Sequence, residues 1–171
     1  MALPRKLKKM HLYGNGESYL SDAAEVTLPK ISHAMEDWRD GGMLGPVKID
    51  MGLEAMECEW TLGGMVPHAI KQMGAVELDA QMLRFMGAYQ GDTDGAVSSV
   101  DILMRGRHQE LDRGNAKPGD ATEHKFKTVL SYYKETLDGE ELMEIDMVRG
   151  IYIVGGVDRH AELRAAIGLE Y

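Results

Sequence analysis

The sequence predicts a mainly β protein of the α+β class, in which antiparallel strands are joined by turns and accompanied by one or two short helices. Residues 96–112 and 122–137 alternate apolar and polar side chains at a period of two, as half-buried strands do. Two other stretches show the i, i+3, i+4 spacing of a helix. Glycine-rich joints, which favour turns, separate the patterned stretches at residues 14–16, 41–46, 91–95 and 114–120.

The first long strand, residues 96–112, is predicted to place Val100, Ile102 and Met104 on one face and mostly polar residues on the other. The second, residues 122–137, is predicted to alternate in the same way. One of its faces carries Phe126, Leu130 and Tyr132, and the other carries Lys125, Lys127, Ser131 and Tyr133. At about 3.3 Å per residue such a stretch would reach roughly 50 Å, so it must bend, bulge or extend past its own domain.

A β-hairpin is predicted next, because Asp138-Gly139 is a favoured two-residue turn between two alternating runs. The strand that follows is expected to cover residues 140–154 and is unusually acidic. Its odd-numbered positions carry the apolar residues Met143, Ile145, Met147, Ile151 and Ile153, which are expected to face the core. Its even-numbered positions carry the carboxylates Glu140, Glu144 and Asp146, which are therefore expected to point away from the core.

Two helices are predicted. Residues 66–74 have apolar residues at helical spacing, with Pro67 near the first turn and Gly74 as a stop. Near the end of the chain, Asp158 is the predicted N-cap and Gly168 the predicted C′ residue. The apolar stripe of this second helix consists of Leu163, Ala166 and Ile167.

Composition limits the kinds of protein this can be. The 171 residues, 44% of them hydrophobic, suit one domain spanning residues 1–171. A net charge of −9 and a pI near 5.1 argue against binding to a phosphate backbone. Cys58 is the single cysteine, so no intrachain disulfide can form, and a small buried side chain is its expected role. With no export signal and no apolar run long enough for a membrane span, a soluble cytoplasmic product is expected.

Catalytic patterns are missing from the sequence, so we expect no enzyme activity, no catalytic residue, no cofactor and no metal. The best metal candidate joins His108, Glu110, Asp112 and His124, although solvated strand-face residues are the favoured interpretation. A β-barrel metalloenzyme that uses His108, Glu110 and His124 is the rival hypothesis. Arg105, Arg107 and Arg113 could together bind an anion. Ordinary salt bridges from these arginines to Asp101, Glu110 and Asp112 are the favoured alternative.

The run GGMLGPVKIDMG, residues 41–52, is apolar and rich in glycine but has little regular pattern. It is typical of a long loop that becomes ordered against a neighbouring molecule. Methionines are frequent around it, and they serve either as core filling or as an adaptable subunit surface. Those in this third of the chain are Met35, Met43, Met51, Met56 and Met65.

Six blocks of the sequence resemble, in the same order, the major tail tube protein of contractile-tailed bacteriophages and the related tube protein of R-type bacteriocins. They are ALPRKLKKMHLYGNG, EVTLPKI, DGGMLGPVKIDMGLEAMECEW, MRGRHQELDRGNAKPGD, SYYKETLDGEELMEID and GVDRHAELRAAIGL. No single block is diagnostic, but six colinear blocks span essentially the whole chain.

The resemblance implies two packed antiparallel sheets, forming a sandwich or barrel, with a flanking helix and a short C-terminal helix. It also implies a structural virion protein, assembled in the cytoplasm of the host bacterium, whose hexameric rings stack into a hollow tail tube that delivers DNA. The implied partners are further copies of the chain, the tail sheath, tape measure, baseplate hub and tail terminator proteins; DNA passes without specific binding, and no membrane is involved. The tube of an R-type bacteriocin, or of a type VI secretion-like injection system, is the alternative.

Two sets of residues receive roles from this resemblance. The apolar residues of the 41–52 run are expected to contact adjacent subunits or rings, and they are Met43, Leu44, Val47, Ile49 and Met51. The acidic strand is a candidate lining of the lumen, through Glu140, Glu144 and Asp146, because an acidic channel repels phosphate. A plain solvated strand, or a surface for the sheath, remains equally open for this strand.

Overall fold

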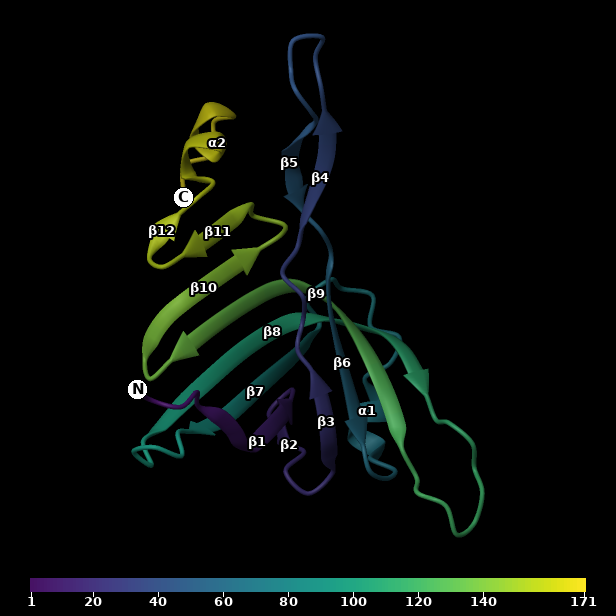
Figure 1. Ribbon diagram of the computed structural model, residues 1–171. Helices are drawn as coiled ribbons and strands as arrows, with labels where there is room; N and C mark the ends of the chain where they lie inside the picture. The colour runs from purple at the N-terminus through teal and green to yellow at the C-terminus, as the bar shows by residue number, and fades with distance from the viewer.

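The computed structural model covers residues 1–171 and consists of antiparallel strands with two short helices (Figure 1). In chain order the elements are β1 (Lys6–Gly14), β2 (Glu17–Ser18), β3 (Ala23–Thr27), β4 (His33–Trp38), β5 (Val47–Leu53), β6 (Met56–Leu62), α1 (Pro67–Lys71), β7 (Gln81–Gln90), β8 (Val97–Asp112), β9 (His124–Leu137), β10 (Glu140–Asp146), β11 (Ile151–Val154), β12 (Val157–Asp158) and α2 (Ala161–Ala166). The predicted class, mainly β with two packed antiparallel layers and short helices, is confirmed.

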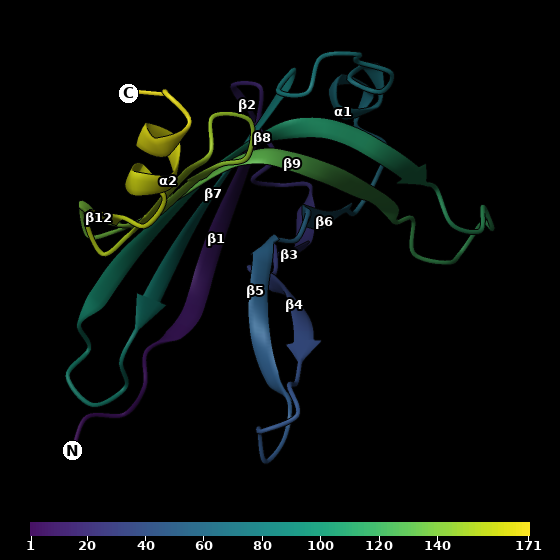
Figure 2. The ribbon, with the colours of Figure 1, turned by 90° about the horizontal axis from the view of Figure 1, so that it is seen from above.

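The two layers share the strands β8 and β9, which bend from one layer into the other (Figure 2). The long layer has the order β12-β11-β10-β9-β8-β7-β1-β2. The short layer is formed by β3, β6, the first half of β9 (residues 124–130) and the last part of β8 (residues 107–112). The outer strands of the short layer do not meet, so no barrel closes within the subunit, contrary to the barrel alternative of the prediction.

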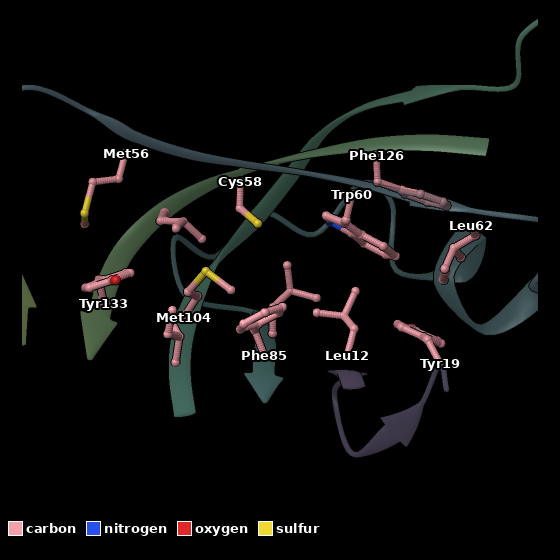
Figure 3. Packing of buried hydrophobic residues seen from close by; sticks show 14 of the residues in the cluster. Leu12, Tyr19, Met56, Cys58, Trp60, Leu62, Phe85, Met104, Phe126 and Tyr133 are labelled. Atoms are coloured by element: carbon pink, nitrogen blue, oxygen red, sulfur yellow. The ribbon is translucent and has the colours of Figure 1, made fainter. Parts of the chain in front are cut away.

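A single cluster of fifteen buried hydrophobic residues lies between the two layers. Trp60 is at its centre, stacked on Phe126 at 4.3 Å between ring centroids and on Tyr19 at 5.6 Å (Figure 3). The Trp60 indole N–H donates to the Thr128 hydroxyl at 2.9 Å, so its polar atom is satisfied inside the core. Cys58 is fully buried beside these rings, as predicted.

The alternation predicted for β9 is interrupted half-way. Phe126 and Leu130 are buried as expected. Tyr132 was predicted to lie on the same face, but the buried residue is its neighbour Tyr133. The register between β8 and β9 shifts by one residue at this point, because Arg105 faces Tyr132 while the next residue, Gly106, faces Leu130. A bulge of this kind reverses the side-chain parity and sharpens the bend, which is how a long strand serves two layers.

Gly106 makes the bulge sterically feasible, and we predict a large loss of stability for Gly106→Ala. A Cβ atom at this position would lie 1.9 Å from the Val129 carbonyl oxygen, so the two central strands would have to separate. The expected cost is about 3 kcal/mol or more in the free energy of unfolding, measured by urea titration. The matched control is Gly41→Ala, where no atom lies within 4 Å of the added carbon and the expected change is within about 0.5 kcal/mol. Equal midpoints for the two variants would contradict the role assigned to Gly106.

Both predicted helices are present, and Gly74 and Gly168 adopt the positive φ angles expected after their last turns. The prediction of Asp158 as the N-cap is wrong, because α2 begins after His160. The Asp158 carboxylate instead pairs with the Arg164 guanidinium, the one buried side chain of α2. Asp158 therefore holds α2 against β12 rather than capping the first turn of the helix.

Candidate functional site

The predicted metal ligands do not converge. His108 and His124 are buried on the core side of their strands, whereas Glu110 and Asp112 pair with Lys127 and Lys125 on the opposite face. No group of three or more His, Cys, Asp and Glu residues is placed to hold a metal ion. The residues of the metalloenzyme alternative therefore form no common site.

His108 is instead part of a buried polar network that attaches α1 to the sheets. One ring nitrogen lies 2.8 Å from the Thr128 hydroxyl and the other 3.1 Å from the Gln72 side-chain oxygen. Gln72 follows α1 directly and also contacts His68, which lies 3.0 Å from the Tyr19 hydroxyl. A neutral ring satisfies both contacts, since one nitrogen accepts and the other donates. Burial lowers the pKa of His108 to about 4 and keeps the ring neutral.

Because the pKa of His108 is lower in the folded than in the unfolded chain, we predict acid destabilisation through this residue. Its contribution is fully present above the ordinary pKa of 6.5 and is lost as the pH falls toward the folded pKa of about 4. The loss should approach about 3 kcal/mol at the acid end. Urea unfolding at pH 7, 5.5 and 4.5 measures it, with His108→Gln as a control that cannot titrate. Parallel pH profiles for the two proteins would refute the role of His108.

The run 41–52, predicted as a loop, is a loop only in its first half, residues 41–46, because β5 begins at Val47. It forms a two-stranded hairpin, β4–β5, that projects from the two layers (Figures 1 and 2). We call residues 33–53 the arm. The prediction was wrong about regularity, because Val47 to Met51 does alternate but the surrounding glycines obscure the pattern. At the base of the arm, the His33 ring lies 2.9 Å from the Asp50 carboxylate and 3.2 Å from the Tyr152 hydroxyl of β11.

One face of the arm is apolar and exposed. Trp38 pairs with Val47 on this face, and Glu36 pairs with Ile49 next to them. Trp38 is 55% exposed, and Leu44 at the tip is completely exposed. An isolated two-stranded hairpin is at best marginally stable, and an apolar face of this kind marks an interaction surface. The predicted contact residues Val47 and Ile49 lie on this face and Met51 continues its alternation, whereas Met43 and Leu44 lie at the tip.

The short layer has two open edges. β3 pairs only with β6, and β8 pairs only with β9 beyond Gly106, where β7 begins. Each edge presents backbone N–H and C=O groups that no other strand of the chain uses. Open edges invite pairing with another chain, and natural proteins normally cover them.

The profile of the phage tail tube protein FII family matches residues 4–168 of this chain. The chain belongs to this family. The tail tube protein of Escherichia phage P2 is 44% identical over 172 residues, covering 99% of this chain and 100% of that protein. The major tail tube protein of Serratia phage KSP20 is 38% identical, covering 99% of both. Membership of a family of structural tail tube proteins confirms the expectation that the chain is not an enzyme.

The fold of this tail tube protein also occurs in contractile injection systems. A chain of the extended PVC sheath-tube complex, an extracellular contractile injection system, superposes with a TM-score of 0.55 at 11% identity, covering 75% of this chain and 88% of that chain. A chain of the anti-feeding prophage baseplate gives a TM-score of 0.52 at 8% identity, covering 80% and 97%. At these identities the likeness concerns the fold alone. No helix of the tail tube protein has the length and apolarity needed to cross a membrane.

The acidic strand of the tail tube protein differs from its prediction. Residues 140–154 form two strands joined by a turn, with Asp146 opposite Ile151 and Glu144 opposite Ile153. Ile151 and Ile153 therefore lie on the carboxylate face rather than on the core face, where Tyr152 replaces them. The reversal is a direct consequence of the turn at residues 147–150.

A bulge between Glu141 and Met143 separates the three predicted lumen carboxylates. Glu140 pairs with Leu137 on the core side of β9, whereas Glu144 and Asp146 pair with Lys134 and Tyr132 on the other side. Glu141 joins that other side and lies 3.7 Å from the Lys134 ammonium. Glu144 and Asp146, which stay on the same face, have local contacts as well. Glu144 accepts a hydrogen bond from the Tyr132 hydroxyl at 2.9 Å, and Asp146 accepts from the backbone N–H groups of Val148 and Arg149.

A second acidic surface of the tail tube protein covers the outer face of the short layer. Five carboxylates share this face with Lys125 and Lys127. The ammonium group of Lys127 lies 3.0 Å from the Glu57 carboxylate. We call these five the short-layer carboxylates, and they are Glu25, Glu57, Glu59, Glu110 and Asp112. This face was not predicted, although the alternation of Met56, Cys58 and Trp60 with Glu57 and Glu59 is visible in the sequence.

Proposed function

We propose that this chain is the building block of the inner tube of a contractile phage tail, in which six copies close a ring and rings stack into a conduit for DNA. One observation carries the proposal: the short layer has a free strand at each end, β3 and the last part of β8. Membership of the tail tube family supports the same assembly. Residues 1–171 act in it as one tail tube domain.

Strand directions support closure of the ring. β3, β6, β9 and β8 are antiparallel at each step, so β3 and β8 run in opposite directions. Rotation about an axis that lies roughly along the strands keeps these directions. β8 of one copy would then meet β3 of the next copy as an antiparallel pair, the same relation as inside the layer. Closure leaves no open edge in the ring, which removes the hazard of uncontrolled pairing.

The arm supports contact between rings. Its exposed apolar residues gain little within one subunit, and about 25 cal/mol per Å² of apolar area becomes available when a neighbouring copy covers them. In this role the contact residues are the predicted ones, Met43, Leu44, Val47, Ile49 and Met51.

The short-layer carboxylates are the lining that this ring favours for the lumen. If β3 and β8 join neighbouring copies, the outer face of the short layer becomes one continuous face of the closed barrel. The core and the long layer lie on its other side, so the acidic face is left for the channel. Carboxylates there would repel phosphate and prevent DNA from binding during passage. Glu144 and Asp146, with Glu140, are the alternative lining.

The remaining partners follow from the tube itself. The tail sheath would surround it, a tape measure protein would occupy the lumen during assembly, and baseplate hub and tail terminator proteins would meet its ends. Assembly would take place in the cytoplasm of the host bacterium. The tube of an R-type bacteriocin or of a type VI secretion-like injection system would use the same subunit contacts, so it differs in what the lumen carries rather than in the ring.

Negative-stain electron microscopy of the purified protein, combined with sedimentation, tests the proposal. We expect rings or stacked tubes with a central channel, formed without any partner protein or after addition of a baseplate initiator. A protein that stays monomeric at high concentration under both conditions would overturn it.

A further inference from the structure

A cavity of about 280 Å³ lies where β8 and β9 bend, on the face of the sheets away from the core. Arg105 and Tyr132 line it from these two strands, and Val148 and Arg149 line it from the β10–β11 turn. Leu78, from the segment between α1 and β7, completes the rim. Leu78 is 54% and Val148 70% exposed, so the entrance of the cavity is apolar while its walls carry two guanidinium groups.

Neither arginine has a carboxylate partner within the subunit, although the chain carries more acidic than basic residues. The Arg105 guanidinium lies 4.0 Å from the centre of the Tyr132 ring, and its Nε atom is buried without a hydrogen-bond partner. The Arg149 guanidinium lies 4.8 Å from the Tyr171 ring. A buried donor left unpaired is unfavourable, and a carboxylate is its strongest acceptor.

Three acidic groups around these arginines are already engaged. Asp101, which the sequence suggested as a partner of the arginines, forms a bidentate pair with Arg84 instead. Glu144 is bound to the Tyr132 hydroxyl. Asp146 and Asp79 also line the cavity, but Asp146 accepts two backbone N–H groups of the turn, and neither lies within 4 Å of an arginine nitrogen. The cavity is therefore suited to a carboxylate brought in by another molecule.

The arm carries a side chain with the matching chemistry. Glu36 is exposed, has no basic partner within 4 Å, and sits on the apolar face opposite Ile49, next to Trp38. The charged residues on the polar face of the arm are paired, since Lys48 contacts Asp37 at 2.9 Å and His33 contacts Asp50. Glu36 thus combines a free carboxylate with apolar neighbours, which complements two free guanidinium groups behind an apolar rim.

We infer that the arm of one copy docks at this cavity on a neighbouring copy, where Arg105 and Arg149 receive Glu36 and the rim residues Leu78 and Val148 cover the apolar side chains around it. The contact joins two different surface patches, so it can be repeated from copy to copy around a ring or along a stack. The inference rests on the proposed role of the arm as the bridge between copies, and it adds the receptor site and its chemistry.

Charge reversal tests the pairing. Glu36→Arg and Arg105→Glu should each raise the protein concentration needed for polymerisation at least about tenfold, and the double variant should return to within about threefold of the original. Arg149→Glu, at an exposed turn position, provides a second single variant if Arg105→Glu does not fold. Arg159→Glu, another exposed arginine outside the cavity, is the matched control and should polymerise normally.

Two outcomes would overturn the inference: normal polymerisation of Glu36→Arg, or a double variant no better than the worse single variant. Leu44→Asp, at the arm tip, distinguishes a failure of the proposed receptor site from a failure of the proposed function. If Leu44→Asp blocks polymerisation while Glu36→Arg does not, the arm still bridges copies but uses another receptor. If both Leu44→Asp and Glu36→Arg fold and form normal tubes, the receptor site and the bridging role of the arm are both refuted.

Discussion

Replacing the arm by a short Gly-Ser link between Ser32 and Glu54 should abolish tube formation and leave the fold intact. The arm contributes no residue to the fully buried core, and its two strands pair only with each other. Its removal therefore costs the subunit little, apart from the contact between His33 and Tyr152 and the packing of Leu53 against the edge of the core. Sedimentation should show soluble monomers or single rings, and circular dichroism an unchanged β spectrum. The free energy of unfolding should change by no more than about 1 kcal/mol.

A finer variant locates the effect on the apolar face. Val47→Ser with Ile49→Ser should block polymerisation, whereas Asp37→Ser with Lys48→Ser, on the polar face, should not. The matched pair keeps the backbone of the arm and removes two side chains in each case. Normal tubes from the apolar-face variant, or from the chain without the arm, would show that stacking depends on other surfaces.

Reversing charge in the lumen should slow the passage of DNA without preventing assembly. Glu25 and Glu59 are exposed on the outer face of the short layer, and changing both to Lys would place a basic band in every ring. Basic side chains bind phosphate by releasing counterions, and the effect is repeated along the whole tube. DNA ejection at about 0.1 M salt should be at least about tenfold slower and should recover as the salt concentration rises.

The controls distinguish the two acidic faces. Glu25→Gln with Glu59→Gln should eject at the original rate, since neutral side chains do not hold phosphate. Glu140→Lys with Glu144→Lys and Asp146→Lys tests the alternative lining by the same measurement. If these three slow ejection while the Glu25 and Glu59 reversals leave it unchanged in particles of normal appearance, the lumen is lined by β10 and the short-layer assignment is wrong.

Local chemistry made much of the fold predictable. Asp138 and Gly139 form the predicted turn with φ angles of 49° and 86°, because few other residue pairs tolerate such a conformation. Val100, Ile102 and Met104 share the core face of β8, since burial of one face enforces the period of two. The excessive length of these strands correctly indicated bends and bulges.

The errors about which face a strand residue occupies come from β-bulges and tight turns. The bulge between Glu141 and Met143 moves Glu140 to the other face, and nothing in the local sequence marks it. The turn that reverses Ile151 and Ile153 had one visible sign, Gly150, which adopts a φ of 66°. The assembly surfaces depend on tertiary placement as well. Arg105 and Arg149 are 44 positions apart in the sequence, and the pairing of β8, β9 and β10 brings them to one cavity.

Cryo-electron microscopy of the assembled tube, at a resolution that separates strands, tests the closure of the ring most directly. The account predicts that β3 of each copy is hydrogen-bonded in antiparallel fashion to residues 107–112 of β8 in the next copy. Six copies with four strands each would give one closed barrel whose inner face carries Glu25 and Glu59. A tube in which both edges stay unpaired, or in which neighbouring copies meet through β12 and β2 of the long layer, would contradict it.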